Sequence, residues 1–229
     1  MKKILIFALF TVILNPIFGQ EKDNTDKAVQ EKPVSPEMMT LQLGTALAKY
    51  GYANKSGLAL LQAADILSQF NLREAKLEKS ETSKVVDDKK VSKPVELDTK
   101  KIIADAKSFA NGNKSELAMI KEVEKKMDAP KTRGRVYGAA RAYRRVEGYS
   151  SNTDYILFEG YSLAEIVISG DGDTDLDLYV YDENDNLVAS STNYTDYCHV
   201  SFIPRRTASF RLKVINRGSI HNNYTLLTN

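Results

Sequence analysis

Apolar and polar residues alternate along the last third of this chain, and that alternation limits the folds it can form. In residues 174–181 the apolar Leu176, Leu178 and Val180 alternate with acidic and aromatic residues. Side chains two residues apart share one face of a strand, so such a segment is expected to bury one face only. Six similar short runs, separated by turn residues, lie at 155–159, 163–168, 187–190, 197–203, 210–215 and 224–227. Seven short strands predict an antiparallel sandwich or jelly roll.

The first half of the chain has helical periodicity instead. Ser35 followed by Pro36 is typical of a helix start, and apolar residues at three- and four-residue spacing predict a helical hairpin over residues 35–70. Residues 98–128 repeat this pattern and predict a second hairpin. The expected fold class is therefore α+β in separate regions, with small N-terminal helical hairpins followed by a C-terminal all-β antiparallel sandwich or jelly roll.

Composition divides the remainder of the chain. Residues 71–97 are rich in Lys, Glu, Asp and Ser and predict a charged, solvated linker with helix as an option at its start. Residues 129–145 interleave arginines with tyrosines and are expected to form a basic connector docked on an acidic neighbour. Residues 146–204 are that neighbour, because they hold no Lys or Arg but many acids. The sandwich domain is expected to span 146–229.

The first twenty residues have the pattern of a signal peptide. Two lysines precede a short apolar run that ends at Asn15, too short to span a bilayer permanently. We expect residues 1–20 to be cleaved near Gly19-Gln20, which leaves residues 21–34 as a flexible N-terminus and an exported protein, periplasmic or extracellular. An uncleaved membrane anchor is the alternative. No later segment is apolar enough to cross a membrane.

Charge and cysteine content exclude several classes of function. The chain has 32 Lys and Arg against 30 Asp and Glu, and two lysines leave with the signal peptide, so the mature protein is neutral and unsuited to nucleic acid. Cys198 is the only cysteine, so no internal disulfide can form. With only His199 and His221 beside it, a zinc site of ordinary spacing is excluded. No catalytic motif occurs, and the protein is not expected to be an enzyme.

The stretch GDGDTDLDLYVYD at residues 170–182 resembles the central motif of bacterial pre-peptidase C-terminal domains. Pro204, the strand at 210–214 and the final strand at 223–226 are similar to the way those domains end, so the resemblance covers about residues 145–229. It implies a β-sandwich of the kind usually appended to secreted enzymes, some relatives of which bind collagen, polysaccharide or calcium. No peptidase domain precedes the module here, so the resemblance implies no enzymatic activity for this small exported bacterial protein.

The acidic run within that motif is the best candidate for a site. It has D-x-D-x-D spacing, but Leu176 stands where an EF-hand needs Gly, which rules that loop out. Calcium prefers carboxylate oxygens, and its candidate ligands are Asp171, Asp173, Asp175, Asp177 and Asp182. A structural role is the alternative, in which loop aspartates cap turns and strand aspartates pair across the sheet with Arg211 or Lys213.

A sugar-stacking face is a further option, formed by Tyr179, Tyr181, Tyr194 and Tyr197. Together these features predict an exported, non-catalytic binding or accessory protein whose contact edge is formed by residues 171–175 and 182–186. The expected partner is an extracellular or envelope protein or polysaccharide. The alternative is a structural or chaperone-like accessory subunit of a secreted enzyme or envelope complex, with no ligand of its own.

Overall fold

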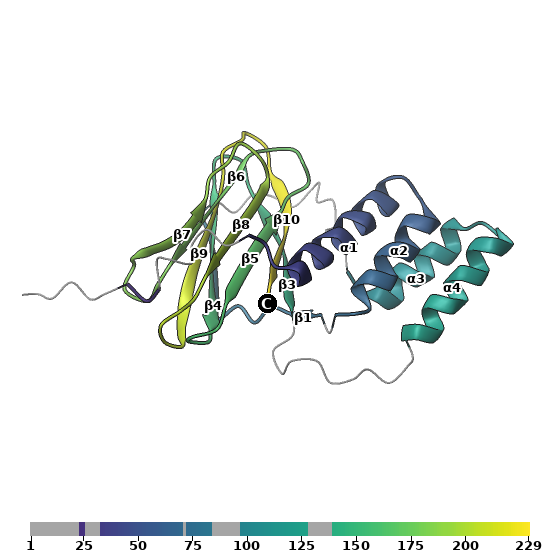
Figure 1. Ribbon diagram of the computed structural model, residues 1–229. Helices are drawn as coiled ribbons and strands as arrows, with labels where there is room; N and C mark the ends of the chain where they lie inside the picture. Colours follow the sequence, from purple (N-terminus) through teal and green to yellow (C-terminus); the bar gives the residue numbers. More distant parts are fainter. Residues whose placement is uncertain (1–22, 26–32, 71, 84–96, 128–138) are drawn as a thin grey trace, which may run out of the picture.

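A computed structural model describes residues 23–25, 33–70, 72–83, 97–127 and 139–229. Within these residues, helices form the N-terminal half and strands form two five-stranded sheets that face each other (Figure 1). The predicted fold class, helical hairpins followed by an antiparallel β-sandwich, is confirmed. The predicted signal peptide lies outside the described residues.

The helices form two hairpins, as the periodicity predicts. They are α1 (Pro36–Ala53), α2 (Gly57–Leu67), α3 (Thr99–Phe109) and α4 (Lys114–Met127). The hydroxyl of Ser35 accepts a hydrogen bond from the amide of Met38, so this residue caps α1 in the expected way. Gly51 allows α1 to approach α2 closely, because a Cβ built there would lie 2.5 Å from Cδ2 of Leu60.

Each sheet contains strands from both halves of the sequence. The first sheet has the order β1 (Arg73–Glu74), β3 (Ala140–Val146), β10 (Asn222–Thr228), β5 (Ala164–Ser169) and β8 (Tyr197–Phe202). The second has the order β2 (Lys79–Thr82), β4 (Ser151–Phe158), β9 (Ala208–Asn216), β6 (Leu176–Tyr181) and β7 (Leu187–Ser191). Neighbours are antiparallel except for β1 and β3, which are parallel.

The core between the sheets is built from the alternating residues that define the strands. Leu176, Leu178 and Val180 of β6 are fully buried in it. Phe202 of β8 lies with its ring centroid 4.9 Å from that of Phe210 on β9, so the aromatic contact crosses from one sheet to the other. Burial of one face per strand is what the period of two predicts.

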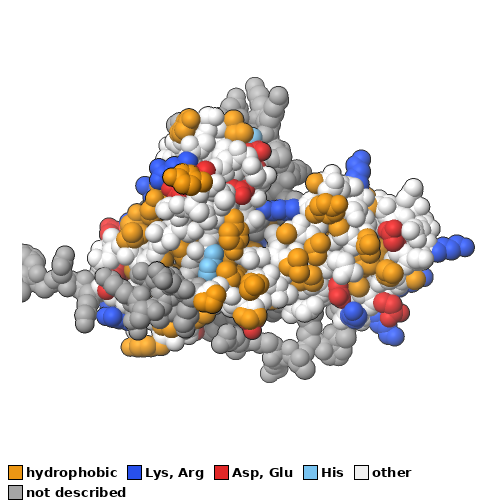
Figure 2. Space-filling view, turned by 45° about the horizontal axis from the view of Figure 1, so that its top comes forward, with side chains coloured by type: hydrophobic (Ala, Val, Ile, Leu, Met, Phe, Trp, Pro, Cys, Tyr) orange, Lys and Arg blue, Asp and Glu red, His pale blue; other side chains and the backbone are white. Residues whose placement is uncertain are grey.

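The helices pack on the outer face of the first sheet. Val167 of β5 and Leu227 of β10 point outward and join the apolar cluster of the helices. Lys49 of α1 donates hydrogen bonds to the carbonyls of Ser169 and Gly170, at 3.1 and 2.7 Å. Apolar side chains also remain visible on the surface of the helical part (Figure 2).

The structure differs from the sequence prediction at three places. The start of the expected linker contains β1 and β2, which extend the two sheets, in place of the optional helix. The end of the expected basic connector is β3, a full member of the first sheet. Asn24 and Thr25, expected in a flexible segment, are buried. Asn24 accepts hydrogen bonds through its side chain from the amides of Arg205 and Arg206.

No helix of the described residues is long and apolar enough to cross a membrane.

A candidate binding surface at one end of the sandwich

The connections at one end of the sandwich come together as a single surface. They are residues 147–150, 170–175, 192–196 and 217–221, which we call the loop end. In Figure 1 it is the upper end of the sandwich, opposite the C-terminus. Loops carried on a packed scaffold are common places for binding residues, because the strands fix their positions.

Backbone hydrogen bonds tie these loops to one another. The amide of Tyr149 donates to the carbonyl of Gly218 at 2.8 Å, and the amide of Arg217 donates to the carbonyl of Asp175 at 2.9 Å. The amide of Gly170 donates to the carbonyl of Asp196 at 2.9 Å. Each bond links two different loops, so the loop end is held in one arrangement before any partner arrives. Such pre-organisation lowers the entropic cost of binding.

Two tyrosines project from this end. Tyr194 is 99% exposed and Tyr149 is 69% exposed. Tyr149 has a φ of 53°, a left-handed conformation that is unusual for a bulky residue. The bonded turn around it maintains this conformation and directs the ring toward solvent. Ile220 adds an exposed apolar side chain from the neighbouring loop. Exposed rings on fixed loops offer flat contact area at a low entropic cost.

Acidic residues of the motif belong to the same loop end. Asp171 accepts from the backbone and side-chain nitrogens of Asn223, at 2.9 and 3.0 Å. Asp173 is exposed on the same loop. Burial, followed by the charge of neighbouring Asp177, raises the pKa of Asp175. The loop end therefore contains several carboxylates, and one of them, Asp175, has a raised pKa.

Asp177, the aspartate within β6, does not pair with Arg211 or Lys213, the partners that the sequence suggests. Asp177 is buried, and its carboxylate accepts from Nε of Arg217 at 2.6 Å. Lys213 lies opposite Tyr179 in the register of β6 and β9, and Arg211 lies opposite Tyr181. The general prediction that a cation pairs with this strand aspartate is met, but by an arginine of the loop end.

Asp182 is separated from the other four predicted ligands. It follows β6, whereas Asp171, Asp173 and Asp175 precede that strand, so the six residues of β6 stand between them. Its carboxylate accepts from the amides of Asn24, Asn184 and Asn186. Burial alone would raise the pKa of Asp182, but these hydrogen bonds lower it overall. Asp182 acts as a turn cap, the structural alternative for such a residue.

The structure therefore does not bring all five predicted calcium ligands together. Among the residues that it describes, no group of three or more His, Cys, Asp or Glu side chains is arranged to hold a metal ion. The four tyrosines of the predicted sugar-stacking face are also divided, because Tyr179 and Tyr181 belong to the second sheet and Tyr197 to the first. Tyr194 alone of these lies within the loop end.

Cys198 and the histidine beside it are not organised as a reactive centre. Cys198 is fully buried and its Sγ lies 3.0 Å from the carbonyl oxygen of Leu176. Burial, with a smaller contribution from Asp177, raises the pKa of this thiol to about 12, so it stays protonated near neutrality. Its neighbour His199 points to the other face of the sheet, where Nε2 lies 3.5 Å from Oε1 of Glu165.

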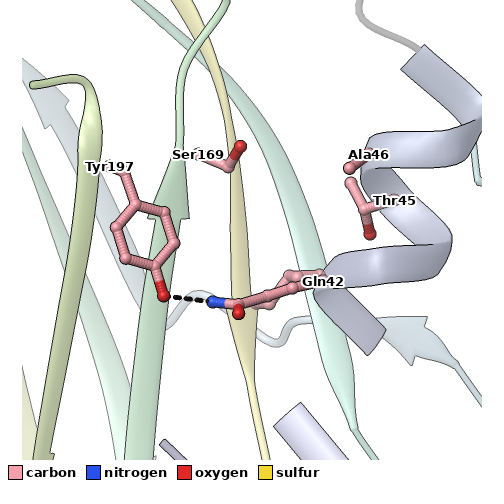
Figure 3. A pocket seen from close by; sticks show the side chains of 6 residues that line it. Gln42, Thr45, Ala46, Ser169 and Tyr197 are labelled. Carbon is pink, nitrogen blue, oxygen red and sulfur yellow. Dashed lines mark hydrogen bonds between the residues drawn. The ribbon is translucent and has the colours of Figure 1, made fainter. Parts of the chain in front are cut away.

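A hollow lies where α1 meets the first sheet. Gln42, Thr45 and Ala46 of α1 line one side, and Tyr197, Ser169 and Leu227 line the other (Figure 3). The amide nitrogen of Gln42 donates to the hydroxyl of Tyr197 across it. Its volume is about 130 Å³, well below the roughly 300 Å³ at which small-molecule sites begin. The hollow is too small to be the principal ligand site.

No family model matches the chain, and no curated protein matches it. Among solved structures it is similar to the pre-peptidase C-terminal domain of a Bacillus anthracis collagenase, with 12% identity over 39% of this chain and 87% of that chain, and a TM-score of 0.32. It is also similar to PliG, a periplasmic inhibitor of g-type lysozyme from Salmonella Typhimurium, with 13% identity over 43% of this chain and 93% of that chain, and a TM-score of 0.29.

A third similar structure comprises the CBM22-1 and GH10 modules of a Clostridium thermocellum xylanase in complex with xylohexaose. The identity is 11% over 38% of this chain and 24% of that chain, with a TM-score of 0.23. All three likenesses are partial and distant. The β-sandwich is established by the strands of this chain itself, and the likenesses say nothing about its ligand.

Proposed function

We propose that this is an exported, non-catalytic binding or accessory protein that contacts its partner through the loop end. The observation on which the proposal depends is that Tyr149 and Tyr194 are exposed on loops that backbone hydrogen bonds link through the two other loops of the loop end. Two exposed rings held at one end of a rigid scaffold provide flat contact area for a partner. The partner class is an extracellular or envelope polysaccharide or protein.

The surface chemistry favours a polysaccharide. A tyrosine ring can stack on the apolar face of a sugar. Carboxylates such as Asp171 and Asp173 can accept hydrogen bonds from sugar hydroxyls. The side chain of Asn223 lies beside Asp171 and adds an amide to the same region. This combination provides both the flat contact and the polar groups that a carbohydrate requires.

The test is a glycan array and a matrix-protein array, probed with the wild-type protein and with a Tyr149→Ala, Tyr194→Ala double variant. Loss of two stacking rings is expected to weaken binding by about 10-fold to 100-fold, since each contact contributes roughly 1 kcal/mol. Tyr161→Ala is the matched control, because Tyr161 is an exposed tyrosine with a φ of 62° that lies in the β4–β5 connection, at the opposite end of the sandwich. It should leave binding unchanged.

Two results would count against this function. Equal binding by the double variant and the wild type would exclude the loop end as the contact surface. Empty arrays with a folded protein would instead favour the alternative, a structural or chaperone-like accessory subunit without a ligand of its own. Identification of an adjacent secreted enzyme in the genome would then indicate the complex to which it belongs.

A further inference from the structure

Helix α1 carries a lysine that reaches from the helical half of the chain to the loop end. Lys49 and Glu37 are the only charged residues of α1, and Lys49 is half-buried against the first sheet. Its ammonium donates three hydrogen bonds, to the carbonyl of Ser169 at 3.1 Å, to the hydroxyl of Ser169 at 3.0 Å and to the carbonyl of Gly170 at 2.7 Å. All three acceptors lie where β5 ends and the loop 170–175 begins.

The surroundings of this ammonium include two loops of the loop end. Burial lowers the pKa of Lys49, and the charges of Asp196 and Asp171 offset that effect only in part. Asp171 belongs to the loop 170–175 and Asp196 to the loop 192–196, so the ammonium attracts a carboxylate of each loop. A cation withdrawn from water needs such partners, because it loses part of its hydration. Lys49 therefore connects α1 to both loops.

The backbone is closely packed at the point where Lys49 bonds to it. A Cβ built on Gly170 would lie 2.4 Å from Oδ2 of Asp196, so the two loops are in contact there. The amide of Gly170 donates to the carbonyl of Asp196 at 2.9 Å, and the amide of Gly172 donates to Oδ2 of Asp196 at 2.5 Å. A shift of Gly170 must therefore disturb the loop that carries Tyr194.

Two further bonds connect the same loop to the second exposed ring. The carbonyl of Asp175, at the end of the loop 170–175, accepts from the amide of Arg217 at 2.9 Å. The carbonyl of Gly218, the next residue, accepts from the amide of Tyr149 at 2.8 Å. Both exposed tyrosines of the loop end are thus linked to the loop whose first residue Lys49 contacts.

We propose that Lys49 is a positioning residue for the loop end, and that the helical half of the chain fixes the binding loops through it. The inference rests on the proposed function, because the loops concerned form the proposed contact surface. An apolar side chain at this position would pack on the sheet without the cost of burying a charge. Lys49 instead supplies three donors at the start of the loop, and loops fixed in advance bind with a smaller entropic cost.

Amide hydrogen exchange of the full chain tests the proposal without a ligand. In Lys49→Met the amides of Gly170 and Gly172 should exchange at least about 10-fold faster than in the wild type, because local opening of the loops becomes easier. A smaller increase is expected at Tyr149, which is linked to Lys49 only through other loops. The amides of β9, in the middle of the second sheet, report any loss of global stability and should change by a smaller factor.

Two further variants separate positioning from a general effect of the substitution. Lys49→Arg keeps the charge and the donors and should hold loop exchange within about 3-fold of the wild type. Lys126→Met is the matched control, because Lys126 of α4 also pairs with another element, through Asp65 of α2, but contacts no part of the loop end. It should leave the loop amides unchanged. A circular dichroism spectrum of each variant establishes that it is folded.

Loop amides that exchange in Lys49→Met as they do in the wild type would overturn the proposal. An equal increase in the loops and in β9 would also overturn it, since Lys49 would then stabilise the fold as a whole. On the glycan and matrix-protein arrays, loops that keep the wild-type arrangement for about a tenth of the time should lower the apparent affinity about 10-fold. Arrays left empty by the wild type would refute the proposed function, whereas the exchange rates would still decide whether Lys49 positions the loops.

Discussion

A buried ion pair joins the two sheets, and its removal should have a large effect on stability. Arg144 of β3 reaches Asp154 of β4 with two contacts, Nε to Oδ2 at 3.2 Å and Nη2 to Oδ1 at 2.9 Å. The side chain of Asp154 is 1% exposed and that of Arg144 is 23% exposed. Arg144→Met shortens the side chain little but removes the guanidinium that contacts the buried Asp154.

The cost follows from the burial of the carboxylate. Removing one partner of a fully buried pair costs about 3–5 kcal/mol, and because Arg144 is partly in water we expect about 2–4 kcal/mol here. For a chain of this size that corresponds to a fall in Tm of roughly 4–16 °C. Urea unfolding followed by circular dichroism measures the free energy directly. Lys107→Met is the control, because its pair with Glu124 is largely exposed and should contribute less than about 1 kcal/mol.

A second variant separates the charge from the packing. Arg144→Met combined with Asp154→Leu removes both charges, so at least half of the lost stability should return. If Arg144→Met unfolds at the same urea concentration as the wild type, the inference that this pair joins the sheets is wrong.

Three further perturbations test other parts of the structure. Gly51→Ala should cost about 1–3 kcal/mol, because the added Cβ meets Leu60; an unchanged Tm would refute the close approach of α1 and α2. Burial raises the pKa of Glu165, but the His199 ring 3.5 Å away and a hydrogen bond from the amide of Ser35 outweigh it and lower that pKa overall. This carboxylate therefore stabilises the fold above about pH 4.5, an effect lost as the pH falls through the lowered value, so Glu165→Gln should show less acid destabilisation than the wild type in urea titrations. If calcium binds at Asp171 and Asp173, about 10 mM calcium should raise the Tm by a few degrees. An unchanged Tm would exclude calcium binding at these residues.

The helices and most strands of the sandwich are predictable from the sequence because their apolar residues are large and regularly spaced. β3 is harder to recognise, since its inward positions are the small Ala140 and Ala142 followed by Arg144. An arginine in the sequence usually indicates a solvent-facing position, yet the side chain of Arg144 points into the sandwich because it pairs there with Asp154. The short, polar strands β1 and β2 give still less signal, because their pairing with β3 and β4 is a long-range contact.

The candidate surface is only partly predictable for a similar reason. The acidic motif supplies one loop of the loop end, at Asp171 to Asp175, but residues 182–186, predicted on the same contact edge, follow β6 and lie at the opposite end of the sandwich. Tyr149 and Ile220 come from turns far away in the sequence, and only the antiparallel order of the strands brings them beside that loop. The pairing of Asp177 with Arg217 depends on strand register, which alternation alone leaves open. The only sequence signal for Tyr149 as a surface residue is that a tyrosine stands in a tight turn.

The two strands that arise between the helical hairpins have a consequence for dissecting this protein. β1 covers the free edge of β3, and β2 covers the free edge of β4. A recombinant fragment that begins at residue 139 would lack both and would present unpaired backbone on each sheet, a template for joining other chains edge to edge. The helical half and the strand half thus cannot be separated at their apparent boundary, and fragments for crystallisation or binding studies should retain residues 72–83.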